Sequence, residues 1–270
     1  MINERFEKYY SDLYGSRWEV LRKKLLQERP AYAFLQGLES PYYLDYASVL
    51  AARSLKLFSH TLPEQQPEPF TVLDACAAPG GKSLVIASIL PAGAQLLSNE
   101  LSAERRRRLS DVLDKHLNVE KRKQIKVCGF DAAAAGKRKS EHGRFKAIFL
   151  DAPCSSEAHV LKDKRALAAW TPARPKFLAQ RQWALLSSAF LLLSDGGSLV
   201  YSTCAITNIE NDGVVQRLLK KYKGCVELDP PDFQEGEKTK FGKIILPDTT
   251  NIGPLYVARF VKNYREKCNA

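Results

Sequence analysis

The sequence lacks the features that mark several large classes of protein. Its six cysteines form no CxxC pair and no cluster with histidine, so we expect no metal site. Their scattered positions favour reduced thiols over a disulfide framework. No stretch approaches the roughly 20 apolar residues of a membrane span, and the charged start MINERFEKYY lacks the apolar core of a signal peptide. We therefore expect a cytoplasmic protein with no membrane partner.

Two common nucleotide-binding fingerprints are also missing. The segment VLDACAAPGGKS, residues 72–83, ends like a P-loop, but Cys76 stands where that motif needs its first glycine. The dinucleotide pattern GxGxxG does not occur after this strand. A nucleoside triphosphatase and a nicotinamide-dependent enzyme are therefore disfavoured, and another nucleoside-bearing ligand is expected.

Charge is the strongest compositional signal. The 270 residues include 41 Lys plus Arg against 30 Asp plus Glu, which gives a net charge of +11. The hydrophobic content of 45% is that of an ordinary globular protein. A basic surface of this kind favours an anionic partner, and nucleic acid is the most economical one.

The chain divides into two parts by pattern. Apolar residues at three- and four-residue spacing predict helices over residues 3–28, around Gly15, and over residues 45–59. A proline-rich segment at 62–70 then predicts a linker. We therefore expect an N-terminal helical extension over residues 1–66 and a second domain over residues 67–270.

Strand and helix patterns alternate in the second domain, which predicts an α/β fold with a mostly parallel sheet. The expected strands are 70–76, 94–100, 124–130, 146–152 and 197–204, with closing strands near 225–229, 243–246 and 255–261. The expected helices are 82–90, 103–117, 175–193 and 208–222.

Polar groups gather where three of these strands end. Gly80 and Gly81 allow a close backbone approach to a ligand at the start of a helix. Asp74, Glu100 and Asp131 end three successive strands, and Glu100 has the spacing of a ribose-binding carboxylate. Each acid alone reads equally well as a helix N-cap. Together they suggest S-adenosylmethionine as the cofactor.

Two cysteines follow the next two strands. Asp151 and Cys154 follow one strand and Cys204 follows another, 50 residues beyond Cys154. Parallel strands end at one edge of a sheet, so both thiols could meet over one substrate, although either alone is often buried and inert. Methylation of cytosine at carbon 5 needs such a thiolate, which adds to carbon 6 and makes carbon 5 nucleophilic.

Five segments together resemble the Nop/Sun family of RNA cytosine-5 methyltransferases: LDACAAPGGKS, SNELSAERRRRL, FLDAPCSS, YSTCAITNIEND and ILPDTTNIGPLYVARF. The resemblance covers residues 42–262 and is closest to the small mitochondrial-type members without an added RNA-binding domain. It implies a class I S-adenosylmethionine-dependent methyltransferase fold, Rossmann-like, with an antiparallel closing strand. The cofactor-binding residues that it implies are Ala77, Ala78, Pro79, Gly80, Gly81, Lys82, Glu100, Arg105, Asp131 and Asp151.

The resemblance also assigns the catalytic roles. It implies that Cys204 is the nucleophile and Cys154 the group that promotes release, while Lys82 and Asp151 orient the cytosine. For the RNA backbone we expect contacts from Lys137–Lys139 and Lys162–Arg165, at the rim of the cleft, rather than from the arginine run Arg105–Arg108.

The expected function is methyl transfer from S-adenosylmethionine to carbon 5 of a cytosine in structured RNA, with ribosomal RNA slightly favoured over transfer RNA. A helper protein is compatible with the sequence. The alternative is a non-catalytic RNA-binding or ribosome-assembly factor on the same fold. DNA methylation is disfavoured by the second thiol.

Overall fold

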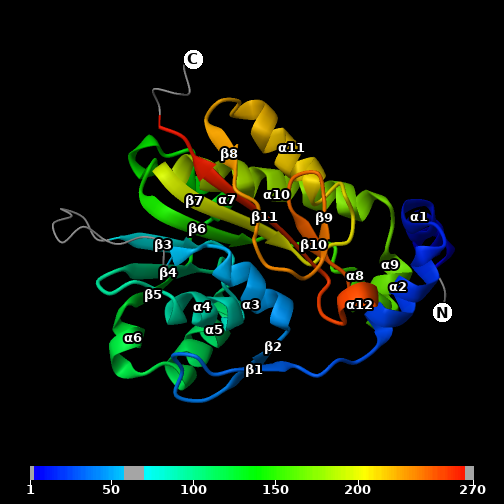
Figure 1. Ribbon diagram of the computed structural model, residues 1–270, viewed down its shortest axis with the longest axis horizontal. Helices are drawn as coiled ribbons and strands as arrows, with labels where there is room; N and C mark the ends of the chain where they lie inside the picture. The colour runs from blue at the N-terminus through cyan, green and yellow to red at the C-terminus, as the bar shows by residue number, and fades with distance from the viewer. Residues whose placement is uncertain (1–2, 58–69, 265–270) are drawn as a thin grey trace.

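The computed structural model describes residues 3–57 and 70–264 of the chain (Figure 1). Its main sheet contains β3 (Thr71–Asp74), β4 (Gln95–Asn99), β5 (Ile125–Cys128), β6 (Phe145–Asp151), β7 (Leu193–Thr203), β8 (Val226–Leu228), β9 (Glu237–Lys238), β10 (Lys243–Ile245) and β11 (Leu255–Lys262). The strand order is β5-β4-β3-β6-β7-β11-β10-β9, with β8 paired to β11. Strands β3 to β7 are parallel, and β11 pairs antiparallel with both β7 and β10. The sheet therefore has the mostly parallel order with an antiparallel closing strand that the sequence predicted.

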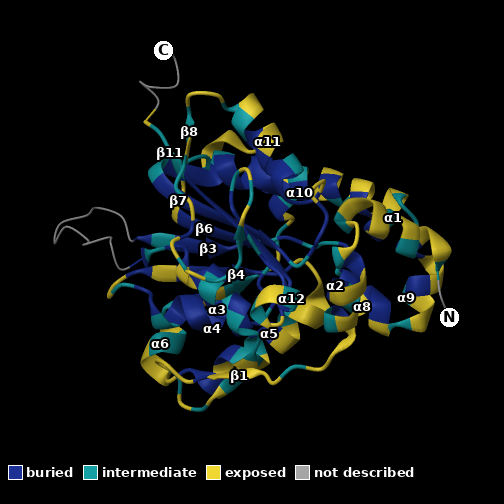
Figure 2. Ribbon diagram, turned by 45° about the vertical axis from the view of Figure 1, so that its right-hand side comes forward, coloured by how far each residue is buried: buried dark blue, intermediate teal, exposed yellow. Residues whose placement is uncertain are grey.

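Helices cover both faces of this sheet, as expected for parallel strands that are apolar on both sides (Figure 1). Buried residues of α3 (Tyr46–Arg53), α4 (Gly81–Ser88) and α5 (Ala103–His116) share one apolar cluster with one face. Those of α7 (Ala132–Ala135), α10 (Ala173–Leu192) and α11 (Asp212–Lys221) share a second cluster with the other face. Figure 2 shows the strands as the buried centre of the molecule.

Five further helices gather at one end of the molecule (Figure 1). They are α1 (Glu4–Tyr14), α2 (Arg17–Leu26), α8 (Glu157–Lys162), α9 (Lys164–Ala169) and α12 (Pro247–Thr250). A third apolar cluster joins Phe6, Tyr10 and Trp18 of α1 and α2 to Trp170 beyond α9 and to Ile206 beyond β7. The N-terminal helices therefore pack on the loops at the carboxyl edge of the sheet. The domain boundary at residue 66 stays a prediction.

The helices predicted over residues 3–28 around Gly15 are confirmed as α1 and α2, which are separated at Gly15, whose φ is 57°. The predicted helix 208–222 begins later, at Asp212. The reason is that the Asn211 side chain bonds to Thr203 Oγ1 and to Ala205 O, at 2.7 and 2.9 Å, which holds the preceding residues in a turn. The predicted helix 45–59 ends at Arg53, and the predicted linker lies almost wholly outside the described residues.

Several elements carry no clear sequence signal. The extension contains the antiparallel pair β1 (Tyr32–Phe34) and β2 (Tyr42–Leu44), where only helices were expected. Short helices α6 (Val119–Lys123), α8 and α9 and the two-residue strand β9 were also not predicted. Short elements hold few residues of any periodic pattern, so tertiary contacts decide them.

The expectation of reduced thiols fails at one position. Cys76, Cys128, Cys154 and Cys204 are free thiols, but Cys225 is disulfide-bonded. This cysteine precedes β8, which pairs with β11, and Cys225 O accepts a hydrogen bond from Asn263 N at 2.9 Å. The last described residues of the chain therefore run beside it.

No helix in residues 3–57 and 70–264 is long and apolar enough to cross a membrane. The same residues contain no cluster of three or more histidine, cysteine or acidic side chains that could hold a metal ion.

Candidate active site

The glycine turn between β3 and α4 is shaped for a close approach of the backbone to a ligand. Gly80 caps α4 with a φ of 121°, a conformation that favours glycine. A Cβ at this position would lie 2.9 Å from Val112 Cγ1 of α5. Below the turn, Ser83 Oγ donates a hydrogen bond of 2.6 Å to Asp74 Oδ2. The packing of Gly80 against α5 and the hydrogen bond from Ser83 to Asp74 together restrict the conformation of the turn.

A first cavity opens in front of this turn. Its walls come from β2, from the end of β3, from the turn and from the end of β6: Tyr42, Tyr43, Leu44, Ser48, Asp74, Cys76, Ala77, Ala78, Pro79, Gly81, Lys82 and Asp151. The Asp74 side chain is fully buried and its Oδ1 has no hydrogen-bond partner. Burial raises the pKa of Asp74 to about 7, and the nearby charge of Asp151 acts in the same direction. This oxygen marks a place for a hydrogen-bond donor or a cation.

A second cavity adjoins the first, and Cys76 and Ala75 lie in its wall. It is also lined by Asn99, Glu100, Leu101, Arg105, Phe130, Asp131, Ala132, Ala133, Pro153, Arg181 and Leu185. Arg105 pairs with Glu100 Oε2 at 3.1 Å and donates to Ala78 O at 2.8 Å, so it ties the glycine turn to the end of β4. Asp131 caps α7 through Ala133 N at 3.0 Å. The N-cap interpretation is thus correct for Asp131, which nevertheless lines the cavity.

The predicted cofactor residues fall into these two cavities, with one exception. Gly80 lines neither and acts through the backbone conformation that it permits. The two cavities share Cys76, so they form one elongated site along the carboxyl edge of β3, β4, β5 and β6. This is the edge at which ligands bind in open α/β sheets.

Lys82 and Asp151 form an ion pair in the first cavity. Lys82 Nζ lies 2.8 Å from Asp151 Oδ2, and Ser202 Oγ donates to Asp151 Oδ1 at 2.7 Å. Burial alone would lower the pKa of Lys82, but the charge and hydrogen bond of Asp151 outweigh it and the pKa is raised. Lys82 therefore stays a cation beside the carboxylate.

The two thiols meet as the sequence predicted. Cys154 Sγ lies 2.8 Å from Cys204 Sγ, although the residues are 50 positions apart. The hydrogen bond from Cys154 lowers the pKa of Cys204, and the same contact together with burial raises the pKa of Cys154. Cys204 is thus the thiol that ionises first, and Cys154 keeps its proton.

A buried pair of carboxyl groups lies under the loop that carries Cys154. Ser155 Oγ contacts Glu157 Oε1 and Glu210 Oε1, and Ser155 N donates to Glu210 Oε2 at 2.9 Å. A hydroxyl has one proton, so it can donate to only one of the two carboxyl groups. Burial raises the pKa of Glu157 to about 6, with a further contribution from the charge of Glu210. At pH values below about 6, a proton on Glu157 would supply the second hydrogen bond to the Ser155 hydroxyl.

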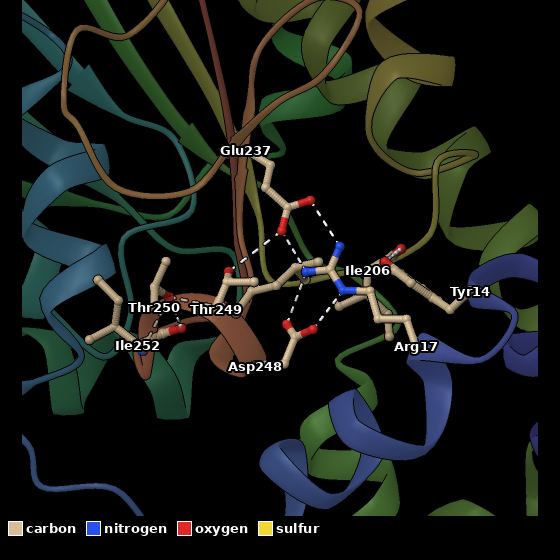
Figure 3. A network of polar contacts seen from close by, with 9 residues as sticks. Tyr14, Arg17, Ile206, Glu237, Asp248, Thr249, Thr250 and Ile252 are labelled. Atoms are coloured by element: carbon tan, nitrogen blue, oxygen red, sulfur yellow. Dashed lines mark hydrogen bonds and ion pairs between the residues drawn. The ribbon is translucent and has the colours of Figure 1, made fainter.

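The N-terminal helices contact the segments that follow the two thiols. Tyr10 OH donates to Glu157 Oε1 at 2.6 Å, and Tyr14 OH donates to Ile206 O at 2.6 Å. Figure 3 shows Arg17 of α2 between Glu237 and Asp248. Arg17 Nε donates a hydrogen bond of 2.6 Å to Asp248 Oδ2. Sequence reasoning missed these partners. The acids that follow the two cysteine motifs, Glu157 in CSSE and Glu210 in NIEND, could have indicated the buried carboxyl pair to which Tyr10 bonds. No such signal marks the partners of Tyr14 and Arg17.

The predicted RNA-facing segments have different outcomes. Lys162–Arg165 joins α8 to α9, which follow the carboxyl end of β6, as the prediction requires. The prediction that Lys137–Lys139 flanks the cleft is wrong. Its neighbours Gly136 and Gly143 bond to Ser188 and Leu191, near the end of α10 that leads into the amino end of β7. In the arginine run, Arg108 is exposed and pairs with Glu104, which fits a solvated helix face.

Comparison with known proteins identifies the family to which the chain is similar. A family model described as 16S rRNA methyltransferase RsmB/F matches residues 61–261. A relative from Shewanella sediminis, ribosomal RNA small subunit methyltransferase F, is 38% identical over 197 residues, covering 72% of this chain and 38% of the relative. The protein of the same name from Klebsiella pneumoniae is 40% identical over 166 residues, covering 61% and 33%. The chain thus spans between a third and two fifths of the length of these relatives.

Two solved structures show the fold. A methyltransferase homologue from Pyrococcus horikoshii superposes with a TM-score of 0.71 at 21% identity, covering 95% of this chain and 94% of the other. NSun6 from the same organism superposes with a TM-score of 0.65 at 24% identity, covering 86% and 55%. The chain has the class I S-adenosylmethionine-dependent methyltransferase fold.

Proposed function

The chain belongs to the RsmB/F family of 16S rRNA methyltransferases, and from this membership we propose that it methylates carbon 5 of a cytosine in ribosomal RNA. The proposal includes S-adenosylmethionine as methyl donor, a covalent bond between Cys204 and the base, and action in the cytoplasm. The observation that carries it is the contact of 2.8 Å between Cys154 Sγ and Cys204 Sγ, next to the Lys82–Asp151 pair. The finer likeness to small mitochondrial-type members stays a prediction.

The residues present fit the cofactor. Asp74 Oδ1 is buried and has no hydrogen-bond partner. S-adenosylmethionine carries an ammonium group and a sulfonium group, either of which would pair with this oxygen. The loop from Ala77 to Lys82 would hold its amino-acid end, and Glu100 and Asp131 would face its ribose and adenine in the second cavity. When bound, the cofactor supplies an electrophilic methyl group.

The protein's own residues account for activation of the base. The thiolate of Cys204 would add to carbon 6 of the cytosine, which makes carbon 5 electron-rich. The ammonium group of Lys82 is held in place by Asp151 and would donate a hydrogen bond to the ring nitrogen, where negative charge develops. The carboxylate of Asp151, oriented by Lys82 and Ser202, would accept a hydrogen bond from the exocyclic amine.

Release reverses the addition. When a water molecule takes the proton from carbon 5 as the base, the electron pair of that C–H bond restores the double bond between carbons 5 and 6, and the C6–S bond breaks so that Cys204 leaves as a thiolate. Cys154 keeps its proton and lies in contact with Cys204 Sγ, so it can donate a hydrogen bond to the leaving sulfur. This is how we assign the release role to Cys154.

Trapping the adduct tests the proposal. The Cys154→Ala protein, incubated with S-adenosylmethionine and transcripts of small-subunit ribosomal RNA, should accumulate a covalent protein–RNA adduct. The double variant Cys154→Ala, Cys204→Ala should form none. An adduct that depends on Cys154 while Cys204 is dispensable would reverse the two roles, and absence of adduct and methyl transfer in all variants would indicate a binding or assembly factor. Transfer RNA in a parallel reaction tests the choice of RNA.

A further inference from the structure

Ser156 occupies an unusual position between the two thiols. Its φ and ψ are 52° and 57°, the left-handed region that a residue with a Cβ seldom adopts. Its Oγ lies 3.2 Å from Cys204 Sγ and 3.4 Å from Cys154 Sγ. A left-handed non-glycine residue is strained and persists only where the surroundings impose it.

The surroundings do impose this conformation. On one side, Ser155 is held by Glu157 and Glu210 through its backbone N–H and its hydroxyl. On the other side, Ser156 O accepts hydrogen bonds from His159 N and Val160 N at 2.9 and 3.0 Å, which start α8. Glu157 Oε2 accepts a hydrogen bond from Ile206 N at 3.2 Å, which ties this loop to the one that follows Cys204.

Glycine would adopt this backbone without strain, yet the chain has serine there. The side chain that brings this strain places a hydroxyl against both sulfur atoms. The hydroxyl has one proton and three acceptors within reach, which are Cys154 O at 3.4 Å and the two sulfur atoms. Cys204 Sγ has the shortest contact of the three, and its pKa is the lowered one of the two thiols, so a thiolate that forms there would be the strongest acceptor for this proton.

We propose that Ser156 is a third catalytic residue of the thiol site, whose hydroxyl donates a hydrogen bond to Cys204 Sγ and stabilises its thiolate. The inference rests on the proposed role of Cys204 as nucleophile. Two donors then converge on one sulfur, the thiol of Cys154 and the hydroxyl of Ser156. The same bond acts in both directions of the reaction, because it stabilises the thiolate before attack and again when it leaves.

A neutral donor is needed because the charges around Cys204 oppose each other. Asp151 and Glu157 disfavour the thiolate, and the Lys82 cation favours it. The hydrogen bond from Ser156 acts with that from Cys154 to lower the pKa of Cys204. Because Lys82 is already paired with Asp151, the hydrogen bonds from Cys154 and Ser156 are what favours the thiolate of Cys204.

The pH dependence of alkylation at Cys204 tests this directly, without RNA or cofactor. Iodoacetamide labels thiolates, and trypsin places Cys154 between Lys146 and Lys162 and Cys204 between Arg181 and Arg217, so mass spectrometry reads each thiol separately. Ser156→Ala removes the hydroxyl and keeps the backbone strain, whereas Ser156→Gly removes both. We expect both variants to raise the labelling midpoint of Cys204 by about half to one pH unit, a roughly three- to tenfold fall in rate at lower pH.

The glycine variant separates a chemical role from a structural one. If Ser156 only shapes the loop, Ser156→Gly restores the wild-type midpoint, and the proposal is wrong; an unchanged midpoint in both variants overturns it too. Asn251→Gly is the matched control, because Asn251 is also left-handed, with a φ of 61°, at the end of α12. A raised midpoint without any RNA adduct in the Cys154→Ala protein would retain the Ser156–Cys204 hydrogen bond but refute the proposed function. With the adduct present, Ser156→Gly should lower kcat for methyl transfer and leave KM for RNA unchanged.

Discussion

Asp151 accepts hydrogen bonds on both carboxylate oxygens, from Lys82 Nζ at 2.8 Å and from Ser202 Oγ at 2.7 Å. The three residues come from the start of α4, from the end of β6 and from β7, so one carboxylate joins the helix after the glycine turn to the two strands that precede the thiols. Its side chain is 27% exposed, toward the cavity. A carboxylate fixed in this way can bond to a bound base without first reorganising.

Asp151→Asn should therefore lower the rate of methyl transfer about 100-fold or more, because the amide no longer holds the Lys82 cation beside the base and accepts a weaker hydrogen bond from the exocyclic amine. Binding of S-adenosylmethionine, measured by calorimetric titration, should change by only a few fold. The exposed carboxyl of Glu104 on α5, which pairs with Arg108, is the control as Glu104→Gln. Equal losses in cofactor affinity and in rate would show that Asp151 serves the cofactor instead of the base.

The buried carboxyl pair predicts a pH dependence of stability. The pKa of Glu157 is raised to about 6 by burial and by Glu210, so the folded protein holds this proton more tightly than the unfolded chain. The resulting stability is fully present below the ordinary glutamate pKa and is lost as the pH rises through about 6. The rise corresponds to about 2 kcal/mol.

Glu157→Gln should remove that part of the pH dependence, since glutamine does not titrate. Urea unfolding of both proteins at pH 4.5 and pH 7 measures the difference, with Glu104→Gln as the exposed control. The difference in free energy of unfolding between the wild-type protein and Glu157→Gln could instead stay the same at both pH values. That result would show that Glu157 does not bind a proton more tightly in the folded protein.

Tyr10 links the N-terminal helices to this pair. Tyr10→Phe keeps the ring among Phe6, Trp18 and Trp170 but removes the hydrogen bond to Glu157. We expect a loss of about 1–2 kcal/mol in the free energy of unfolding. Because the third apolar cluster includes residues from α1, α2, α8 and the loop beyond β7, unfolding should remain a single transition. Two separate transitions would instead support an extension, residues 1–66, that folds independently.

The sequence predicted the sheet well because β3 to β7 are short apolar runs, each followed by polar residues at one edge. It also predicted that Cys154 and Cys204 meet, since strands β6 and β7 are parallel neighbours. What it could not predict depends on contacts between distant segments. The left-handed backbone of Ser156, the burial of Glu157 beside Glu210, and the Arg17 bridge to Glu237 and Asp248 arise only when residues far apart in the chain pack together.

The variant Gly80→Ala, which adds a single methyl group, tests whether the glycine turn closely approaches the cofactor. Its φ of 121° strains any other residue, and a Cβ there would press on Val112 at 2.9 Å, so Gly80→Ala should shift the turn that carries Ala78 and Pro79. We expect affinity for S-adenosylmethionine to fall at least about tenfold, measured by calorimetric titration, with a loss of about 1–2 kcal/mol in the free energy of unfolding.

Gly93 supplies the matched control. Its φ of 74° is also left-handed, but a Cβ there would meet no atom within 4 Å, and it lies outside both cavities of the candidate site. Gly93→Ala should therefore share the backbone strain and keep the cofactor affinity of the wild-type protein. If both alanine variants lose affinity equally, the loss at Gly80 follows from general destabilisation, and the close approach of the turn to the cofactor is refuted.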